Sequence, residues 1–240
     1  MGLTDSGRKI SAEDHARRVR EMFARISPRY DLLNHLLSAN VDKRWRRAVT
    51  RKVRTLLPAE DAQVLDVACG TGDLSIELFE NTGAKVVGLD FCRPMLERAA
   101  KKNRRLPFVE GDALRLPFEE GAFDAVTIAF GLRNLSSVED GLKELRRVLK
   151  PKGWAAILEF SKPTMPGFRA LMATYCTRLL PRIGGVISGS RSAYEYLPDS
   201  VSRFPDQPAL AALMRDAGFD EVAFKNLTGG IVALHTGRRK

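Results

Sequence analysis

The chain has 240 residues, 44% of them hydrophobic and 28% charged, which is typical of a soluble globular protein with one large core. No apolar run approaches the roughly 20 residues of a membrane-spanning helix and no signal-peptide core is found, so we expect a cytoplasmic protein. Its three cysteines, Cys69, Cys92 and Cys176, are far apart and form no C-x-x-C pair, which argues against a disulfide framework or a bound metal.

The net charge of +10 is concentrated near the N-terminus. Before residue 55, fourteen Lys and Arg stand against six Asp and Glu, so this segment carries +8 of the total. A basic segment of this kind can serve nucleic acid, an anionic membrane surface or only solubility. Composition alone leaves all three open.

Helical patterns come first in the chain. Apolar residues recur at helical spacing over residues 12–26, and a second amphipathic pattern covers residues 42–57, with a short turn or helix at 30–34 between them. These segments precede the first predicted strand. We therefore expect residues 1–58 to form an N-terminal helical extension that does not fold independently.

Strand and helix patterns then alternate, which favours an α/β fold with a doubly wound, mostly parallel sheet. The predicted strands are residues 63–67, 85–90, 108–110, 123–129 and 154–160. The predicted helices are residues 73–80, 94–103, 138–149 and 207–217. Residues 221–226 and 231–236 should close the sheet as an antiparallel hairpin, giving seven strands in all.

Residues 162–205 interrupt this alternation. The segment is rich in Gly, Pro, Ser, Tyr and Arg, and shows one helical pattern near residues 168–180. We interpret it as an insertion over the C-terminal edge of the sheet, within a single domain that covers residues 59–240.

The most informative stretch is residues 64–73, with the sequence VLDVACGTGD. A β-branched run, a glycine-flanked loop and a helix start present backbone N–H groups to a ligand. Asp66, Asp90 and Asp112 fall in or after three successive strands, whose carboxyl ends line one crevice in a doubly wound sheet. Asp90 lies 20 residues after the loop, where an acid accepts hydrogen bonds from ribose hydroxyls.

The loop chemistry favours S-adenosylmethionine over a dinucleotide. A dinucleotide loop needs a third glycine, but Ser75 stands there, and Asp73 at the helix start would repel a pyrophosphate. S-adenosylmethionine carries no phosphate and has a positive sulfonium and ammonium. Gly70 and Gly72 would let the backbone approach this cofactor, and Asp66 would receive its ammonium group. The alternative is that the glycines only turn the chain.

With these acids the loop resembles the first motif of class I S-adenosylmethionine-dependent methyltransferases. Further segments resemble the ubiquinone/menaquinone biosynthesis C-methyltransferase family: residues 30–38 followed by Trp45, 129–134, 147–163, and 194–200 with 204–205 and 217–219. The resemblance covers about residues 20–236. Two positions depart from the family pattern, Asp42 in the first signature and Lys152 in the second, and neither is in the cofactor loop.

This resemblance implies a cofactor, a reaction and a set of contacts. The cofactor contacts would be Thr71, Asp90 and the pair Asp112-Ala113, in a methyltransferase domain with a substrate lid at 162–205. The family methylates a ring carbon of a prenylated quinol, and we favour demethylmenaquinol in menaquinone biosynthesis. The alternative acceptor is 2-methoxy-6-polyprenyl-benzoquinol in ubiquinone biosynthesis.

Catalytic roles are expected for Arg133 and Asn134, which follow the fourth strand. Arg133 would stabilise the developing phenolate and Asn134 would orient the ring, although a loop arginine and a helix-capping asparagine would look the same. Lid contacts with the quinol ring are expected from three tyrosines, Tyr30, Tyr194 and Tyr196. Structural or surface roles are expected for the three histidines, His15, His35 and His235.

The prenyl tail of such an acceptor lies in a membrane, which suggests that the basic N-terminal helices bind the membrane surface. We expect peripheral binding to anionic lipid at the inner face of the membrane. The candidate lipid contacts are Arg17, Arg18, Arg20, Arg46, Arg47 and Arg51.

Two rival functions are considered, an RNA methyltransferase and a non-catalytic cofactor-binding subunit. The sequence has no run of interleaved basic and aromatic residues of the kind that binds RNA, which argues against the first. The oligomeric state stays open, a homodimer included.

Overall fold

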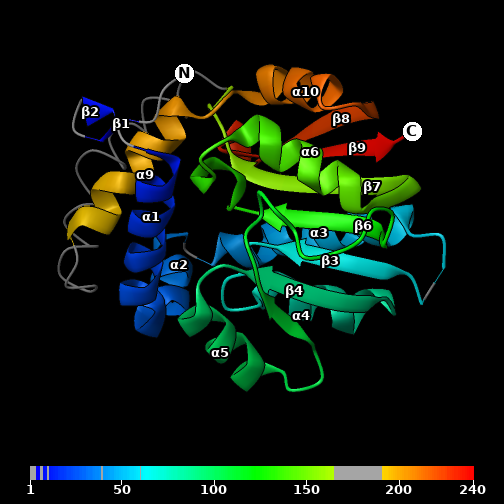
Figure 1. Ribbon diagram of the computed structural model, residues 1–240, viewed down its shortest axis with the longest axis horizontal. Helices are drawn as coiled ribbons and strands as arrows, with labels where there is room; N and C mark the ends of the chain where they lie inside the picture. Colours follow the sequence, from blue (N-terminus) through cyan, green and yellow to red (C-terminus); the bar gives the residue numbers. More distant parts are fainter. Residues whose placement is uncertain (1–3, 6–7, 10, 39, 60, 165–190) are drawn as a thin grey trace.

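A seven-stranded mixed sheet forms the centre of the molecule in the computed structural model, which describes residues 4–5, 8–9, 11–38, 40–59, 61–164 and 191–240 (Figure 1). The strand order is β5-β4-β3-β6-β7-β9-β8. The strands are β3 (Gln63–Val67), β4 (Lys85–Asp90), β5 (Phe108–Glu110), β6 (Phe123–Ala129), β7 (Leu149–Phe160), β8 (Phe219–Leu227) and β9 (Val232–Arg239). β9 pairs antiparallel with β7 and β8, and the other pairs are parallel.

Helices surround this sheet. They are α1 (Ala12–Ile26), α2 (Tyr30–Leu37), α3 (Val41–Leu56), α4 (Asp73–Thr82), α5 (Arg93–Lys102), α6 (Val138–Val148), α9 (Arg191–Arg203) and α10 (Gln207–Asp216). Short 3-10 turns lie at Ser27–Arg29, Leu132–Asn134 and Thr228–Gly230. β1 (Thr4–Asp5) and β2 (Arg8–Lys9) pair with each other outside the main sheet. Within the described ranges, no helix has the length and apolar character needed to cross a bilayer.

The alternation of side chains along β3 divides the core in two. Leu65 and Val67 pack in one cluster with residues of α6 and α10, whereas Val64 packs in the other with residues of α3 and α4. Both faces of the sheet are therefore covered by helices, as the parallel pairing requires. The doubly wound α/β fold with an antiparallel C-terminal pair is confirmed.

α3 belongs to this core although it precedes the first strand. Trp45, Val49 and Val53 recur on one face of the helix and are buried in the cluster under the sheet. The Trp45 indole N–H also donates to Thr228 Oγ1 at 2.8 Å, near the opposite end of the chain. This packing supports the expectation that the N-terminal extension has no separate fold.

Four of the predicted strands coincide with β3, β4, β5 and β6, and both β8 and β9 are longer than predicted. Three further segments differ more. α2 runs to Leu37, and β7 begins at Leu149 rather than at 154, through an irregular pairing next to β6. α9 was not expected, because Pro198 inside it interrupts the helical pattern. Its Ser200 and the following Phe204 are nevertheless buried at helical spacing. The helix predicted near 168–180 lies outside the described residues.

Candidate functional site

A cavity of about 220 Å³ lies at the carboxyl ends of β3, β4 and β6. α1 crosses this edge of the sheet, toward which the arrowheads of β3 and β6 point in Figure 1. Four groups of residues line the cavity. The first group precedes the sheet in the chain and comprises Ala12, Glu13, Ala16, Phe23 and Tyr30. The second follows β3 and comprises Ala68 and Gly70. The third comprises residues 89–91, Met95 and residues 111–114, and the fourth comprises residues 129–131 and 134–136.

The loop after β3 is held in an unusual conformation. Ala68 has φ 51° and Phe130, after the adjacent β6, has φ 57°, which is the left-handed region that non-glycine residues rarely adopt. A Cβ on Gly131 would lie 2.5 Å from Cβ of Ala68, so only glycine lets these two loops meet. A Cβ on Gly72 would lie 2.9 Å from Cβ of Ala99, so this glycine serves helix packing and does not line the cavity.

Asp66 lies behind the loop rather than in the cavity. Its side chain is buried, and its two carboxylate oxygens accept hydrogen bonds from Ser75 Oγ at 2.6 Å and Thr127 Oγ1 at 2.7 Å. Burial raises the pKa of Asp66 to about 6. The carboxylate therefore joins β3, α4 and β6. Its predicted contact with the cofactor ammonium stays a prediction.

Asp90 lines the cavity, at the end of β4, as predicted. Its Oδ2 accepts a hydrogen bond from the Gly70 N–H at 2.8 Å and its Oδ1 accepts one from the Cys92 N–H at 2.8 Å. Burial raises the pKa of this carboxyl to about 6. A carboxylate with free lone pairs at a cavity wall is suited to accept hydrogen bonds from a pair of hydroxyls.

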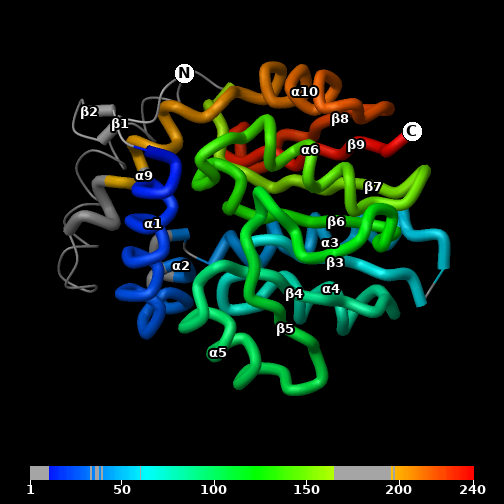
Figure 2. Tube along the Cα trace, viewed as in Figure 1, coloured from blue at the N-terminus to red at the C-terminus, as the bar shows by residue number. Residues whose placement is uncertain are grey.

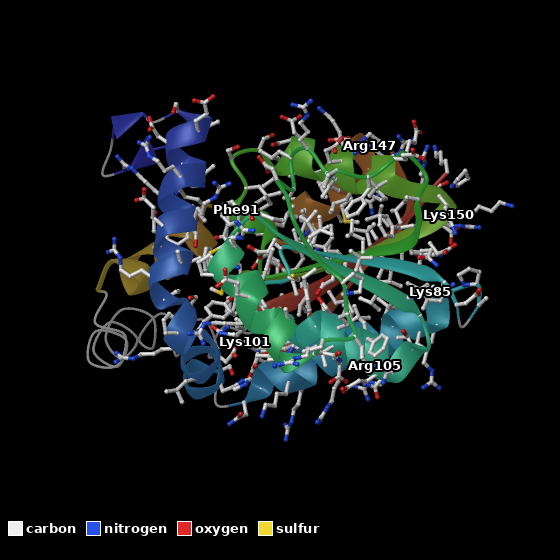
Figure 3. All side chains as sticks on the ribbon, turned by 60° about the horizontal axis from the view of Figure 1, so that its bottom comes forward. Lys85, Phe91, Lys101, Arg105, Arg147 and Lys150 are labelled. Atoms are coloured by element: carbon white, nitrogen blue, oxygen red, sulfur yellow. The ribbon has the colours of Figure 1, made fainter. Side chains whose placement is uncertain are left out.

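Asp112 and Ala113 also line the cavity. Asp112 is exposed and its Oδ1 accepts a hydrogen bond from the Leu114 N–H at 2.9 Å, whereas Ala113 is buried. Phe91 and Met95 add apolar wall on the neighbouring α5 side, and Figure 3 shows Phe91 beside α1. This end of the cavity combines apolar walls with an acid at its rim.

Thr71 is nearly inaccessible and its hydroxyl faces away from the cavity lining. The hydroxyl donates to Asp31 Oδ1 at 2.5 Å and accepts from Lys102 Nζ at 2.9 Å. Only its backbone remains for the cofactor contact implied by the resemblance. That contact stays a prediction.

Asn134 lines the cavity and Arg133 lies behind it. Arg133 Nη1 donates to Glu159 Oε1 at 2.7 Å and to the Phe130 carbonyl at 2.6 Å, in a pair whose side chains are only 8% and 1% exposed. Its Nε is buried without a hydrogen-bond partner among the described residues. Burial raises the pKa of Glu159, and the charge of Arg133 opposes this shift. The roles predicted for both residues are not tested by this geometry.

Two of the three predicted lid tyrosines reach this region. Tyr30 lines the cavity, and Tyr196 on α9 donates to Asn134 Oδ1 at 3.2 Å. Burial raises the pKa of both phenols, while the nearby charge of Arg133 acts to lower them. Tyr194 belongs to α9, but its side chain lies outside the described part of the structure.

Each of the three histidines contacts another part of the chain. His35 contacts Asp42 at 2.9 Å, and His235 is buried with Nε2 3.0 Å from the Gln207 carbonyl. His15, expected on the surface or in a structural role, has Nε2 3.1 Å from the Asn134 carbonyl beside the cavity. Burial lowers the pKa of His15. Among the described residues, we find no group of three or more His, Cys, Asp or Glu side chains that could hold a metal ion.

Comparison with known proteins identifies the family. A model of the ubiE/COQ5 methyltransferase family matches residues 11–239. The chain belongs to this family. It is 50% identical to a demethylmenaquinone methyltransferase of Thermus thermophilus, over 91% of this chain and 100% of that protein. It is 43% identical to a ubiquinone/menaquinone biosynthesis C-methyltransferase of Geotalea uraniireducens, over 99% of each chain.

The fold is also similar to solved structures of lower sequence identity. A crystal structure of an S-adenosylmethionine-dependent methyltransferase from Thermotoga maritima matches with TM-score 0.66 and 21% identity, covering 92% of this chain and 99% of that one. The ubiE/COQ5 member described here is thus an S-adenosylmethionine-dependent methyltransferase, as the sequence predicted.

The residues present fit this cofactor. Asp90 would offer carboxylate lone pairs at the wall to the ribose hydroxyls, and Phe91, Met95 and Ala113 would give apolar surface for the adenine. Gly70 leaves the loop side of the cavity without a side chain, and a Cβ there would meet only the Tyr30 ring, at 3.8 Å. When bound, S-adenosylmethionine supplies an electrophilic methyl group on its sulfonium.

The residues that α1 contributes to the cavity lining were not predicted from the sequence. Ala12 and Ala16 line the cavity, one helical turn apart, and Phe23 lies two turns further along the same helix. This spacing of small and aromatic residues was the available signal. The segment was interpreted only as part of an N-terminal helical extension that presents basic residues to lipid.

Cofactor affinity should fall as the pH falls through about 6, because ionised Asp90 is the form that accepts ribose hydroxyls and attracts a sulfonium. Burial raises the pKa of Asp90 to about 6, so binding below that pH requires the release of a proton. We expect the affinity for S-adenosylmethionine, measured by titration calorimetry, to fall about tenfold between about pH 7 and pH 5.

The stability of the empty protein should change in the opposite direction. Because the pKa of Asp90 in the folded state exceeds its ordinary value, the folded state binds the extra proton, and the free energy of unfolding falls as pH rises from about 4 to 6. Asp90→Asn should flatten the pH dependence of cofactor binding. It should remove only the Asp90 share of the stability dependence, because burial also raises the pKa of Asp66 to about 6. Glu97→Gln, exposed on α5, should preserve both dependences. A wild-type pH profile of cofactor binding in Asp90→Asn would contradict the assignment.

Proposed function

We propose that this enzyme transfers a methyl group from S-adenosylmethionine to a ring carbon of demethylmenaquinol. The observation that carries the proposal is the 50% identity to a demethylmenaquinone methyltransferase along the whole length of that protein. A cavity with both apolar walls and convergent polar groups is consistent with a cofactor and an aromatic acceptor.

The chemistry requires a nucleophilic ring carbon. A quinol carbon becomes nucleophilic when an adjacent hydroxyl loses its proton, so the site must favour the phenolate and align the carbon with the methyl group. Asn134 lies at the cavity wall with Oδ1 accepting from Tyr196 and Nδ2 donating to the Phe130 carbonyl at 3.2 Å. Held in this way, Asn134 and Tyr196 orient the ring.

Arg133 supplies the positive charge for the phenolate. Burial raises the pKa of the Tyr30 and Tyr196 phenols and the positive charge of Arg133 acts to lower it, which supports a role for this charge at the cavity wall. Glu159 and the stacked ring of Phe160, 5.3 Å from the guanidinium, fix its position. Because Arg133 lies behind the cavity wall, its charge would act on the acceptor oxygen from there or through a bridging water.

A benzoquinol of the ubiquinone pathway is the second candidate acceptor. The relative from Geotalea, whose name includes both quinones, supports it at 43% identity over the whole chain. The rival RNA methyltransferase has no such support, because the relatives named above are both quinone methyltransferases.

We also propose that the enzyme works at an anionic membrane surface. Arg17, Arg18 and Arg20 are exposed on α1, and Arg47 and Arg51 are exposed one turn apart on α3. Leu32, on the helix between them, is 59% exposed, and exposed apolar and basic residues together suit the lipid interface.

Arg46, predicted as a lipid contact, has another function. Its side chain is 14% exposed and pairs with Asp42 at 2.9 Å and Asp73 at 3.2 Å. It is therefore committed to the protein interior, and we leave it out of the proposed membrane surface.

The acceptor is tested with labelled methyl groups. We expect S-adenosylmethionine carrying a radioactive methyl group to label demethylmenaquinol rapidly, a methoxy-benzoquinol more slowly and bulk RNA not at all. Extraction into organic solvent and counting measure the transfer. Labelling of RNA without labelling of either quinol would contradict the proposal, and no transfer to any of them would favour a non-catalytic subunit.

Removing Arg133 should slow turnover at saturating cofactor. Because a lone Glu159 would be a buried unpaired charge, we choose the double variant Arg133→Met with Glu159→Gln. Its kcat should fall about 10- to 100-fold, with less than about threefold change in cofactor affinity. Arg146→Met, which loses a part-buried arginine bonded to the Gly218 carbonyl, is the matched control. Unchanged turnover in the double variant would remove Arg133 from the mechanism.

Membrane binding should depend on charge and salt. The double reversal Arg47→Glu with Arg51→Glu should weaken binding to phosphatidylserine vesicles, measured by co-sedimentation, by about 30-fold or more. Each basic residue near such a surface contributes about 1 kcal/mol, two are lost, and two negative charges are added. The matched reversal is Lys85→Glu with Arg104→Glu, and it should have little effect. Both residues are exposed, Lys85 at the start of β4 and Arg104 in the turn before β5. Binding that ignores both lipid charge and salt would contradict the proposal.

A further inference from the structure

Lys102 joins three parts of the chain next to the glycine loop. It is the last residue of α5, and its ammonium lies 2.7 Å from Asp31 Oδ2, 2.7 Å from Asp73 Oδ1 and 2.9 Å from Thr71 Oγ1. An ammonium has three protons to donate, and each finds an acceptor here. The three acceptors belong to α2, to the loop after β3 and to the start of α4.

The contact between α2 and the loop is also direct. Asp31 Oδ1 accepts the Thr71 hydroxyl at 2.5 Å, so one carboxylate holds both Thr71 and Lys102. At the other end of α2, His35 Nδ1 lies 2.9 Å from Asp42 Oδ2. Side-chain contacts therefore hold this short helix at both ends, and the contacts of Asp31 are those nearest to the cofactor loop.

Tyr30, the residue before Asp31, connects these contacts of Asp31 to the cavity. Tyr30 begins α2, lines the cavity and lies over Gly70. Any movement of the first turn of α2 away from the loop would carry Tyr30 out of the cavity wall. The position of this wall residue thus depends on Asp31, and through it on Lys102.

Electrostatics make Lys102 the essential partner. Asp31 and Asp73 share one ammonium, and without it two carboxylates would face each other across Thr71. Of these two carboxylates, Arg46 reaches only that of Asp73, at 3.2 Å. The three charged side chains are 29–35% exposed, so an isolated pair would contribute little, but a network of shared charges is worth more than the same pairs taken singly.

We propose that Lys102, through Asp31 and Thr71, is a positioning residue that keeps α2 and Tyr30 closed on the cofactor loop and so slows the release of S-adenosylmethionine. Lys102 does not line the cavity and is not a catalytic residue. The proposal rests on cofactor binding alone and is independent of the identity of the methyl acceptor.

The test compares two neighbouring lysines of α5. Lys102→Met removes the shared ammonium and keeps the length of the side chain, whereas Lys101→Met removes an exposed charge from the same turn (Figure 3). The measured quantity is the dissociation rate of radiolabelled S-adenosylmethionine during a chase with unlabelled cofactor. We expect this rate to rise about tenfold in Lys102→Met and to stay within about twofold of wild type in Lys101→Met.

A merely structural role would lower the fraction of active protein without changing the dissociation rate of the remainder. We therefore expect the KM for S-adenosylmethionine to rise with dissociation in Lys102→Met, while kcat at saturating cofactor changes less than about threefold. Lys102→Arg, which keeps the charge, should recover most of the retention. A wild-type dissociation rate in folded Lys102→Met overturns the proposal.

Asp31→Asn provides a second, milder variant in case Lys102→Met does not fold. It weakens the other side of the same contact and should also speed dissociation. Combined with Lys102→Met, its effect should be clearly less than additive, because both changes break one interaction. Fully additive effects, or an Asp31→Asn protein that retains the cofactor like wild type, would contradict the proposal.

Discussion

The hydrogen bonds of two buried carboxylates fix the loop around which the whole site is built. Asp66 joins β3 to α4 and β6 through the hydroxyls of Ser75 and Thr127. Asp90 joins the end of β4 to the same loop through the Gly70 N–H. Because both acids are buried, each of these bonds is strong and its loss is costly. The cavity keeps its shape because three strand ends are connected in this way.

The fold was largely predictable because its signals are local. β-branched runs followed by glycine or acidic residues marked β3 and β4 correctly, and the helical stripe of Trp45, Val49 and Val53 marked α3. α9 was missed because Pro198 removes a local helical signal, while its burial depends on distant parts of the chain. Local patterns record which face of an element is apolar. They do not record what covers it.

The candidate site was predicted in part for the same reason. Asp90, Asp112 and Asn134 lie at strand ends, where topology alone brings them to one cavity. The partners of the charged residues could not be predicted, since Arg133 and Glu159 are 26 residues apart and Lys102 and Asp31 are 71 apart, and only the order of the sheet brings them together. Thr71 was predicted as a cofactor contact, whereas its hydroxyl makes a contact with α2 that the sequence did not indicate.

The site thus combines a cavity with a buried Arg133–Glu159 pair behind its wall. In the proposed reaction, the charge of Arg133 favours a phenolate whose ring carbon, rather than its oxygen, attacks the methyl group. The most direct measurement is nuclear magnetic resonance of the product formed from demethylmenaquinol and S-adenosylmethionine labelled with carbon-13 in the methyl group. We predict that the labelled methyl carbon is bonded to a ring carbon. A labelled methyl group bonded to oxygen would contradict the proposed reaction.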